Sequence, residues 1–326
     1  MMREMWLRKK IIPWPGKLIA SSHNNMQHTQ HIAMVRPAAF GYNGETAINN
    51  HFQQQMADDN AALQEQAVIQ FDRLVSLLRT NGIDVLVLED KSDPPKPDAV
   101  FPNNWFCCNN GLIQVFPLFA ESRRLEKNRA MIDAIKAHAG ISIVKDWGSY
   151  EKQQLFLEGT GSMVIDHSHD IAYACLSART SESLFRQFCE ENNYLPICFS
   201  AKDEQGREIY HTNVMLCIAE RFSIVCLDAI TTPIDLEKIR HELETTGHEI
   251  IPITFDQMNS FAGNMLELIN DKEEVILLMS KRAFDVLHAD QLEKIEQYAR
   301  IIHADVGVIE QAAGGSVRCM VAELFY

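Results

Sequence analysis

The 326-residue sequence contains no Cys-x-x-Cys pair, no apolar run long enough to cross a bilayer and no excess of basic residues. Its net charge of −14 argues against nucleic acid and anionic membranes as partners, because both attract basic surfaces. The eight cysteines lack the Cys/His spacings typical of zinc sites, so we expect no metal site, and several of them lie inside apolar runs. Buried free thiols are typical of a reducing compartment, so we predict a cytoplasmic protein.

A glycine-rich phosphate-binding motif is also missing. The stretch "AGGS" from Ala313 lacks both the lysine and the following helix of such a motif. The first 26 residues carry basic side chains around a short apolar part, which Pro13 and Pro15 interrupt, so they form no signal-peptide core. We expect residues 1–26 to be a loose extension, whose place in the natural protein the sequence leaves open. Residues 27–326 are expected to form a single domain.

A repeat of roughly 50 residues runs along the chain. Small or polar residues followed by a short apolar run recur in "PDAVFPNNWF", "EGTGSMVI", "HTNVMLCI", "AGNMLELI" and "SVRCMVAEL". Aligned on Asn104, Gly161, Asn213, Asn264 and Cys319, these segments are separated by 57, 52, 51 and 55 residues. The segment "HIAMVRPAAF" near the start is either a sixth, partial member or the closing strand of the first unit.

The same order of elements follows each landmark. After "HTNVMLCI" comes the strand-like "FSIVCLDAI", then a helix that starts at Thr232-Pro233 and ends at Gly247, then the strand "HEIIPIT". The unit is therefore strand, strand, helix, strand, repeated about five times, which predicts an α/β protein. Five such units favour closure into a ring, because an open stack would leave unpaired edges. In a ring, the equivalent strand ends converge on the axis.

The convergence predicts a central cleft that holds a thiol, an imidazole, carboxylates and amides. Cysteine beside histidine is a nucleophile with its general acid/base, and a carboxylate on the second ring nitrogen fixes the tautomer. Cys319, His211 and Glu158 are the candidates for these roles. Each also has an ordinary explanation as a packed thiol, a structural hydrogen-bonding group or a turn residue. The other polar residues at this phase of the repeat are Asp98, Asn103, Asn104, Asn213 and Asn264.

Several segments carry a specific resemblance. "MVRPAAFGYN", "PDAVFPNNW", "RRLEKNR", "FLEGTGSMVID", "YACLSART", "YHTNVMLC", "FAGNMLEL" and "GGSVRCMVAELF" resemble motifs of the pentein superfamily, which includes arginine deiminases, dimethylarginine dimethylaminohydrolases and amidinotransferases. The bacterial citrulline-utilisation hydrolases, an amidinotransferase-like group, are the most similar. The resemblance covers about residues 26–326 and implies a five-fold pseudosymmetric α/β-propeller of ββαβ units.

The resemblance also implies roles for individual residues. Cys319 matches the family nucleophile, His211 the general acid/base and Glu158 its carboxylate partner. Substrate-binding roles are expected for a further set, which consists of Asp98, Asn103, Asn104, Arg179, Asn213, Asn264 and Arg36. Within this set, Asp98 matches an aspartate and Arg179 a carboxylate-binding arginine of the dimethylarginine enzymes. The sequence departs from its relatives at four positions, because amides stand at Asn103, Asn104 and Asn213 and a glycine at Gly161 where relatives carry acids.

These residues favour a cysteine-dependent hydrolase of the ureido or guanidino group of citrulline, arginine or a close derivative. The expected reaction needs no cofactor, and its partner is a small amino acid. Amides in place of carboxylates suit a neutral ureido group, so citrulline is expected to be favoured over arginine, with ornithine as product. Two alternatives stay open, an amidinotransferase that passes the group to an amine and an inactive binding protein on the same fold. The sequence also leaves open whether the protein is a homo-oligomer.

Overall fold

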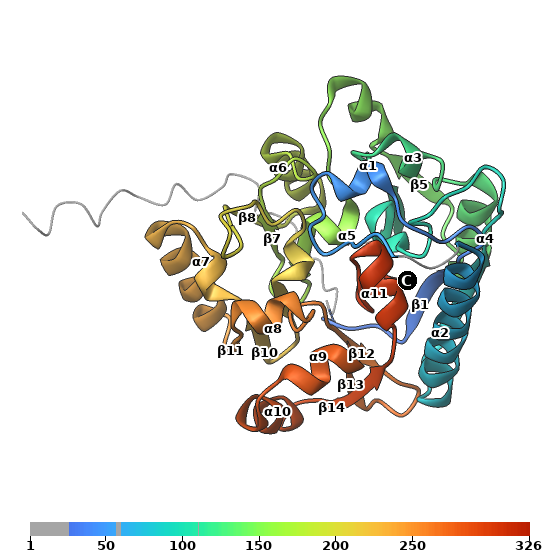
Figure 1. Cartoon of the computed structure of the whole chain (residues 1–326). Coiled ribbons are helices and arrows are strands. Elements are labelled where there is room, and N and C mark those ends of the chain that lie inside the picture. The colour runs from blue at the N-terminus through green and yellow to red at the C-terminus, as the bar shows by residue number, and fades with distance from the viewer. Residues whose placement is uncertain (1–25, 57–59, 110) are drawn as a thin grey trace, which may run out of the picture.

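Five three-stranded sheets make up the frame of the described part of the protein (Figure 1). The structure is a computed structural model that describes residues 26–326 except 57–59 and 110, so the expected extension lies outside the described residues but for Met26. The sheets, each given from its first to its third strand, are β3 (Phe106–Asn109), β4 (Leu112–Val115) and β5 (Ile143–Asp146); β6 (Met163–Asp166), β7 (Ile171–Cys175) and β8 (Leu195–Phe199); β9 (Leu216–Ile218), β10 (Phe222–Val225) and β11 (Glu249–Pro252); β12 (Leu266–Ile269), β13 (Val275–Ser280) and β14 (Arg300–Ala304); and β15 (Ala322–Glu323), β1 (His31–Arg36) and β2 (Asp84–Glu89).

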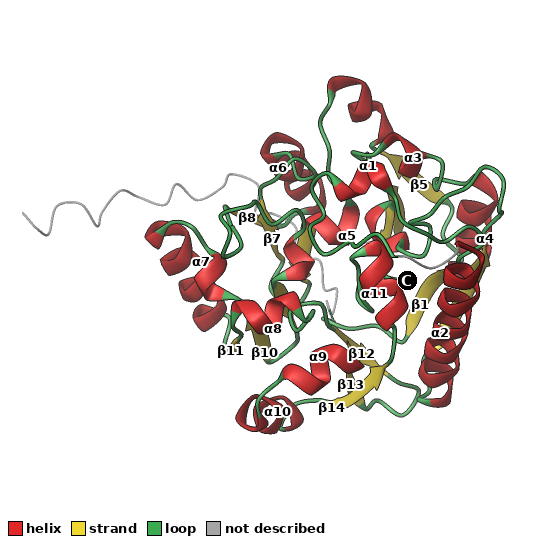
Figure 2. Cartoon of the chain, in the orientation of Figure 1, coloured by secondary structure: helices red, strands yellow, loops and turns green. Residues whose placement is uncertain are grey.

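Each unit follows the predicted ββαβ order. The first strand runs antiparallel to the second, and the third runs parallel to the second after a helical crossover. In the same order of units, the crossovers contain α4 (Arg129–Ala139), α6 (Glu182–Asn192), α7 (Pro233–Thr245), α9 (Lys281–Val286) with α10 (Ala289–Glu296), and α2 (Asn60–Thr80). Figure 2 shows these helices on the outside of the sheets. A parallel pair requires such a crossover, and the repeat therefore fixes the mixed α/β class.

Shorter helices lie in the connections between units and in those between the second and third strands of a unit. They are α1 (Gly44–Ala47), α3 (Glu121–Arg124), α5 (Gly159–Ser162), α8 (Phe255–Asn259) and α11 (Gly307–Ala313), with the 3₁₀ helices η1 (Pro102–Asn104), η2 (Gly148–Gln153), η3 (Thr212–Val214) and η4 (Leu227–Ala229). None of the helices in the described part of the chain is long and apolar enough to cross a bilayer.

The two ends of the described chain share one sheet. β15 pairs with β1, with Ala322 opposite Ala33, so the segment "HIAMVRPAAF" is the middle strand of the unit that the C-terminal strand completes. It is thus neither a sixth member nor part of the unit that contains β3. A backbone bridge between Cys108 and Leu324 then joins this last unit to the first. The units lie around a common centre, near which α5 and α11 are seen (Figure 1).

Local sequence explains where the crossover helices begin and end. The side chain of Thr232 caps α7 at Asp235 N, Pro233 occupies the first helical position, and Gly247 adopts φ 82° just beyond the helix. These bounds confirm the helix predicted from Thr232-Pro233 to Gly247. The inner strands β3, β7 and β10 are buried throughout, whereas the outer strand β5 is largely exposed. The continuous apolar runs thus mark the buried strands near the centre, whereas the exposed strand lies at the outer edge of its sheet.

All five landmark residues lie immediately before the first strand of their unit. Asn104 ends η1, Gly161 lies in α5, and Asn213 lies in η3, while Asn264 and Cys319 follow tight turns. These turns contact one another, because α5 packs against both η1 and η3, and Asn213 and Asn264 both contact the Cys319 sulfur. The predicted convergence is therefore present.

Candidate active site

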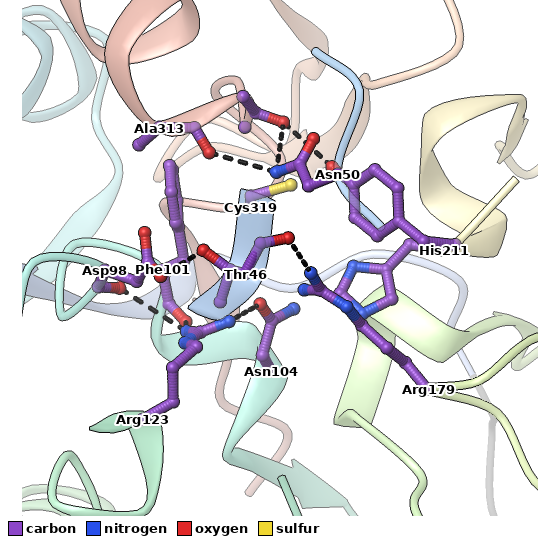
Figure 3. A pocket seen from close by; sticks show the side chains of 13 residues that line it. Thr46, Asn50, Asp98, Phe101, Asn104, Arg123, Arg179, His211, Ala313 and Cys319 are labelled. Atoms are coloured by element: carbon purple, nitrogen blue, oxygen red, sulfur yellow. Dashed lines mark hydrogen bonds between the residues drawn. The ribbon is translucent and has the colours of Figure 1, made fainter. Parts of the chain in front are cut away.

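A small cavity lies where these turns meet (Figure 3). Its wall contains five of the ten residues expected from the sequence, namely Asp98, Asn104, Arg179, His211 and Cys319. Four others contact this wall from behind, namely Glu158, Asn103, Asn213 and Asn264. Arg36 lies elsewhere.

Cys319 sits in a glycine-opened turn after α11. Gly314 has a φ of 65°, and a Cβ on Gly315 would lie 2.7 Å from the ring of Phe101, so the turn needs glycine at both positions. The Cys319 sulfur accepts hydrogen bonds from Asn264 Nδ2 at 3.3 Å and Asn213 Nδ2 at 3.5 Å. Two amide donors aimed at one sulfur stabilise a thiolate, which is the reactive form of cysteine.

His211 and Glu158 form a buried pair. Glu158 Oε2 lies 2.8 Å from His211 Nε2, and its other oxygen accepts from the backbone N–H of Phe119. Burial raises the pKa of Glu158, but Arg179 and the hydrogen bond from His211 outweigh it and hold that pKa at about 2. Burial lowers the pKa of His211 to about 4, even though Glu158 acts in the opposite direction. At neutral pH the carboxylate is therefore ionised and the imidazole is neutral, with Nδ1 left as its acceptor.

Gly161 makes room for this imidazole. A Cβ on Gly161 would lie 2.8 Å from His211 Nδ1 and Cε1 and 2.4 Å from Asn104 Nδ2. These distances are shorter than van der Waals contact, so a larger residue at this position would displace one of the two side chains. The glycine found where relatives carry an acid is thus a packing requirement of this site.

Asp98 is a buried carboxylate with one unpaired oxygen. Its Oδ2 accepts from Asn43 Nδ2 at 2.8 Å and from Thr46 Oγ1 at 3.1 Å, whereas Oδ1 has no hydrogen-bond partner among the described residues. Burial raises the pKa of Asp98, and the nearby Arg123 opposes this rise. A buried acceptor without a partner is costly, so Oδ1 is suited to a ligand donor in the cavity.

Asn103 and Asn104 belong to a chain of side-chain hydrogen bonds. Asn104 Nδ2 donates to Asn103 Oδ1 at 3.0 Å, and Asn104 Oδ1 accepts from Arg123 Nη1 at 2.5 Å. Arg123 also forms a two-pronged pair with Glu126, at 2.8 Å for both bonds. Burial raises the pKa of Glu126 to about 7, against the effect of Arg123. Asn104 is therefore anchored by a cation and does not face the cavity as a free amide.

Arg179 connects the buried pair of His211 and Glu158 to the segment around Thr46, which lines the cavity. Its Nη1 lies 3.5 Å from Glu158 Oε2, Nε donates to Asn49 Oδ1 at 2.8 Å, and Nη2 donates to the backbone oxygen of Thr46 at 2.8 Å. The guanidinium also lies 4.8 Å above the ring of Tyr210. Arg179 thus lines the cavity as expected, but most of its donors already have protein partners.

Arg36 requires a correction. Its guanidinium makes a two-pronged ion pair with Asp72 at 2.7 and 2.8 Å, on the surface between β2 and α2. The reason is topological, because Arg36 is the last residue of β1 and its side chain turns outward to α2 instead of inward to the axis. The structure therefore gives no support to the expected substrate-binding role of Arg36.

Other residues of the cavity wall were missed by sequence reasoning, namely Thr46, Asn50, Phe101, Arg123, Tyr210 and the backbone of Ala313 to Gly315. Arg123 is the first residue of the segment "RRLEKNR", whose resemblance to a family motif could have marked it as a site residue. Thr46 and Asn50 come from the connection between β1 and α2, which lies outside the repeat. Among the described residues, the two side-chain groups able to hold a metal ion lie outside this cavity.

The fold and this set of residues define the class of the protein, which is the pentein superfamily of guanidino-modifying enzymes. Residues 36–326 match the model of the eukaryotic N,N-dimethylarginine dimethylhydrolase family, and the chain belongs to this family. The pentein prediction is thereby confirmed, whereas the narrower bacterial citrulline-utilisation group stays a prediction. Comparison with curated protein sequences finds no match.

Solved structures share the fold at low sequence identity. ArgZ, an arginine dihydrolase from cyanobacteria, superposes with a TM-score of 0.69 at 17% identity over 90% of this chain. The match spans 41% of full-length ArgZ and 96% of its N-terminal domain, which was solved with substrate. The dimethylarginine enzyme DDAH from Pseudomonas aeruginosa, solved with citrulline, gives a TM-score of 0.62 at 20% identity over 90% of this chain and 99% of its own.

Proposed function

We propose that the protein hydrolyses a C–N bond in the ureido or guanidino group of a small amino acid, with Cys319 as nucleophile. The observation that carries this proposal is the Cys319 sulfur held by two amide donors in the same cavity wall as the His211 imidazole, which Glu158 orients. This is the arrangement of a nucleophile with its base and orienting carboxylate. A hydrolase is also the class that the family description names.

The groups allow a two-step reaction. The thiol proton passes to His211, and the Cys319 sulfur attacks the planar carbon of the substrate. The bond from this carbon to the side-chain nitrogen of the product breaks as His211 protonates that nitrogen. With citrulline, ornithine leaves and a carbamoyl group stays on the sulfur. His211 then takes a proton from water, which attacks the carbamoyl carbon. The C–S bond breaks as the proton returns from His211 to the Cys319 sulfur, and the released carbamic acid decomposes to carbon dioxide and ammonia.

The charges of the cavity suit a zwitterionic amino acid. Arg123 and Arg179 supply two guanidinium groups to its wall, and these are the cations available to a substrate carboxylate. Asp98 supplies an acceptor with an unpaired oxygen for an ammonium or other N–H donor. In this proposal, the substrate carboxylate replaces hydrogen bonds that Arg179 makes to Asn49 and Thr46.

A neutral ureido group is the proposed preference at the reacting end. Amides surround the Cys319 sulfur, and Asn213 Oδ1 has no partner among the described residues, so the nearest groups can both donate and accept. A guanidinium would need a carboxylate there, because burying an unpaired cation is costly. Citrulline, the ligand solved in the Pseudomonas enzyme, is therefore preferred over arginine, the substrate named for ArgZ.

The test is kcat/KM for citrulline, arginine and methylarginines, with ornithine, citrulline and ammonia measured as products. We expect citrulline to be the better substrate. Asn213→Asp should shift the ratio of the two kcat/KM values toward arginine by roughly tenfold, which corresponds to about 1.4 kcal/mol of relative transition-state stabilisation. Asn104→Asp is the matched control, since its carboxylate would pair with Arg123 and shift the ratio less. A wild-type preference for arginine would refute the charge argument and leave the nucleophile standing.

The two alternatives predict other results. An amidinotransferase would form an amidino-amine adduct when an amine acceptor is added, whereas a hydrolase releases the same products with or without it. A binding protein would take up citrulline without turnover and would leave Cys319 unlabelled by an amidine electrophile. Mass spectrometry of the labelled protein distinguishes this last outcome from the other two.

A further inference from the structure

A second group of functional side chains lies at the opposite end of the strands. His31 begins β1, Asp84 begins β2 directly opposite it in the parallel register, and His138 lies in the last turn of α4. Cys319 precedes β15, which runs antiparallel to β1, so the cavity and this group are at opposite ends of the same sheet. All three side chains are partly exposed, with 34%, 41% and 27% of their surface accessible.

The three donor atoms already point at one another. His31 Nδ1 lies 2.9 Å and His138 Nε2 lies 3.2 Å from the same oxygen, Asp84 Oδ2, and all three atoms lie within 4.8 Å of each other. Tetrahedral zinc with bonds of 2.0–2.1 Å separates its ligand atoms by about 3.3 Å. The two separations from Asp84 Oδ2 are already close to this value, so small side-chain rotations would admit an ion among the three atoms.

We propose that His31, Asp84 and His138 bind a divalent transition-metal ion such as Zn²⁺. Two imidazoles and one carboxylate are a ligand set that zinc, cobalt and nickel accept, and the partial exposure leaves a coordination position for water. The net charge of −14 favours any cation at the surface. The bound ion would connect the last unit, which supplies β1 and β2, to the first unit, which supplies α4.

A second group of the same composition provides an internal comparison. Asp166, His169 and His248 also bring their donor atoms within 4.8 Å. There, however, His248 Nε2 contacts the backbone oxygen of Ala219 at 2.9 Å and Nδ1 contacts Thr246 Oγ1 at 2.7 Å, so both of its nitrogens are engaged. No such competing contact involves the three donor atoms of the first group in the described part of the chain, and the ion is assigned there.

The ring of Tyr326 packs beside the two histidines, and the unfolding temperature is the quantity that metal binding should change. The ring of Tyr326 lies 4.6 Å from the ring of His31 and 6.3 Å from that of His138, centre to centre. An ion that fixes both imidazoles would order this end of the chain. Binding should therefore raise the unfolding temperature, since a ligand that binds only the folded state stabilises it.

The experiment is calorimetric titration of the full chain with ZnCl₂, free of any histidine tag and carrying Cys319→Ser so that the reactive thiol takes no metal. We expect one equivalent of zinc with a rise in Tm, and a tetrahedral absorption band when Co²⁺ is the probe. His31→Gln, His138→Gln and Asp84→Asn should each weaken binding at least tenfold. The exposed His241→Gln and the comparison variant His169→Gln should bind as the parent does.

Circular dichroism and Tm without metal show whether each variant is folded. If either His31→Gln or His138→Gln is not folded, the other of these two variants decides the outcome. Absence of binding to the parent, or unchanged binding in the folded His31→Gln and His138→Gln variants, would overturn the proposal. Loss of binding in His169→Gln alone would move the ion to the other group and also overturn it. None of these outcomes depends on the proposed hydrolase activity, because the parent protein lacks the nucleophile.

Discussion

The amide nitrogen of Asn264 lies 3.3 Å from the sulfur of Cys319, although 55 residues separate the two in the chain. They occupy the same position in consecutive units, and Asn264 Oδ1 also accepts from the backbone N–H of Arg318. One amide thus holds both the turn that carries the thiol and the thiol itself. The repeat thereby supplies the thiol from one unit and its amide donor from the preceding one.

Replacing Cys319 with alanine or serine should abolish turnover and preserve the fold. The side chain contributes only a small volume to the packing, and loss of a nucleophile costs on the order of 10⁶ in kcat. Turnover of citrulline and thermal unfolding should be measured on the same preparations. Activity that persists in Cys319→Ala would contradict the mechanism, whereas unfolding of this variant would support a structural thiol instead.

Gly161→Ala should lower kcat by at least tenfold with a smaller effect on KM. The added methyl group would collide with the His211 ring at 2.8 Å and with Asn104 Nδ2 at 2.4 Å, so it would displace the base. Gly44→Ala is the matched control, because a Cβ at Gly44 meets nothing within 4 Å and should leave the kinetics unchanged. Equal kinetics of Gly161→Ala and the wild type would show that the position of the imidazole does not limit the rate.

Asp98→Asn should raise KM for the amino-acid substrate by roughly tenfold, with kcat less affected. The reason is that Asp98 Oδ1 is a buried acceptor without a partner in the cavity wall, and hydrogen bonds to charged groups contribute about 1.5–3 kcal/mol.

Arg36→Gln removes a side chain that the sequence predicts to bind the substrate and that the structure pairs with Asp72 outside the cavity. Its kcat/KM should equal that of the wild type, and a large loss there would reverse the correction.

The free energy of unfolding should fall as the pH is lowered from 7 to 5. His211 stays neutral in the folded protein, with a pKa of about 4 that burial lowers, but titrates at its ordinary value when unfolded. The unfolded chain therefore binds more protons in this window, and the loss is about 2 kcal/mol for this one group. Urea unfolding of His211→Gln at both pH values should show a smaller drop than the wild type. The exposed His241→Gln should reproduce the wild-type drop, and identical slopes in all three proteins would contradict the assignment.

The repeat, the α/β class and the triad of candidates were accessible from sequence because they depend on local patterns. Apolar strands, capped helices and a landmark every 51 to 57 residues specify the ββαβ unit without reference to the rest of the chain. The helix that begins at Pro233 shows how far this reaches, since its cap and its terminal glycine are both local. Equivalent positions in a closed set of units must meet, so the sequence also predicts that Cys319, His211 and Glu158 lie close together.

Tertiary structure alone decided which side chains of the unrepeated segments reach the site. Thr46 lines the cavity because Arg179 and Asp98, which belong to other units, hydrogen-bond to it. The side chain of Arg36 lies outside the cavity because it pairs with Asp72 of α2. The pairing of His31, Asp84 and His138 likewise depends on strand register and on how α4 packs beside β2. Sequence determines which units form, because hydrogen bonding and burial act within each one. Contacts between units depend on their placement, and no local pattern encodes that.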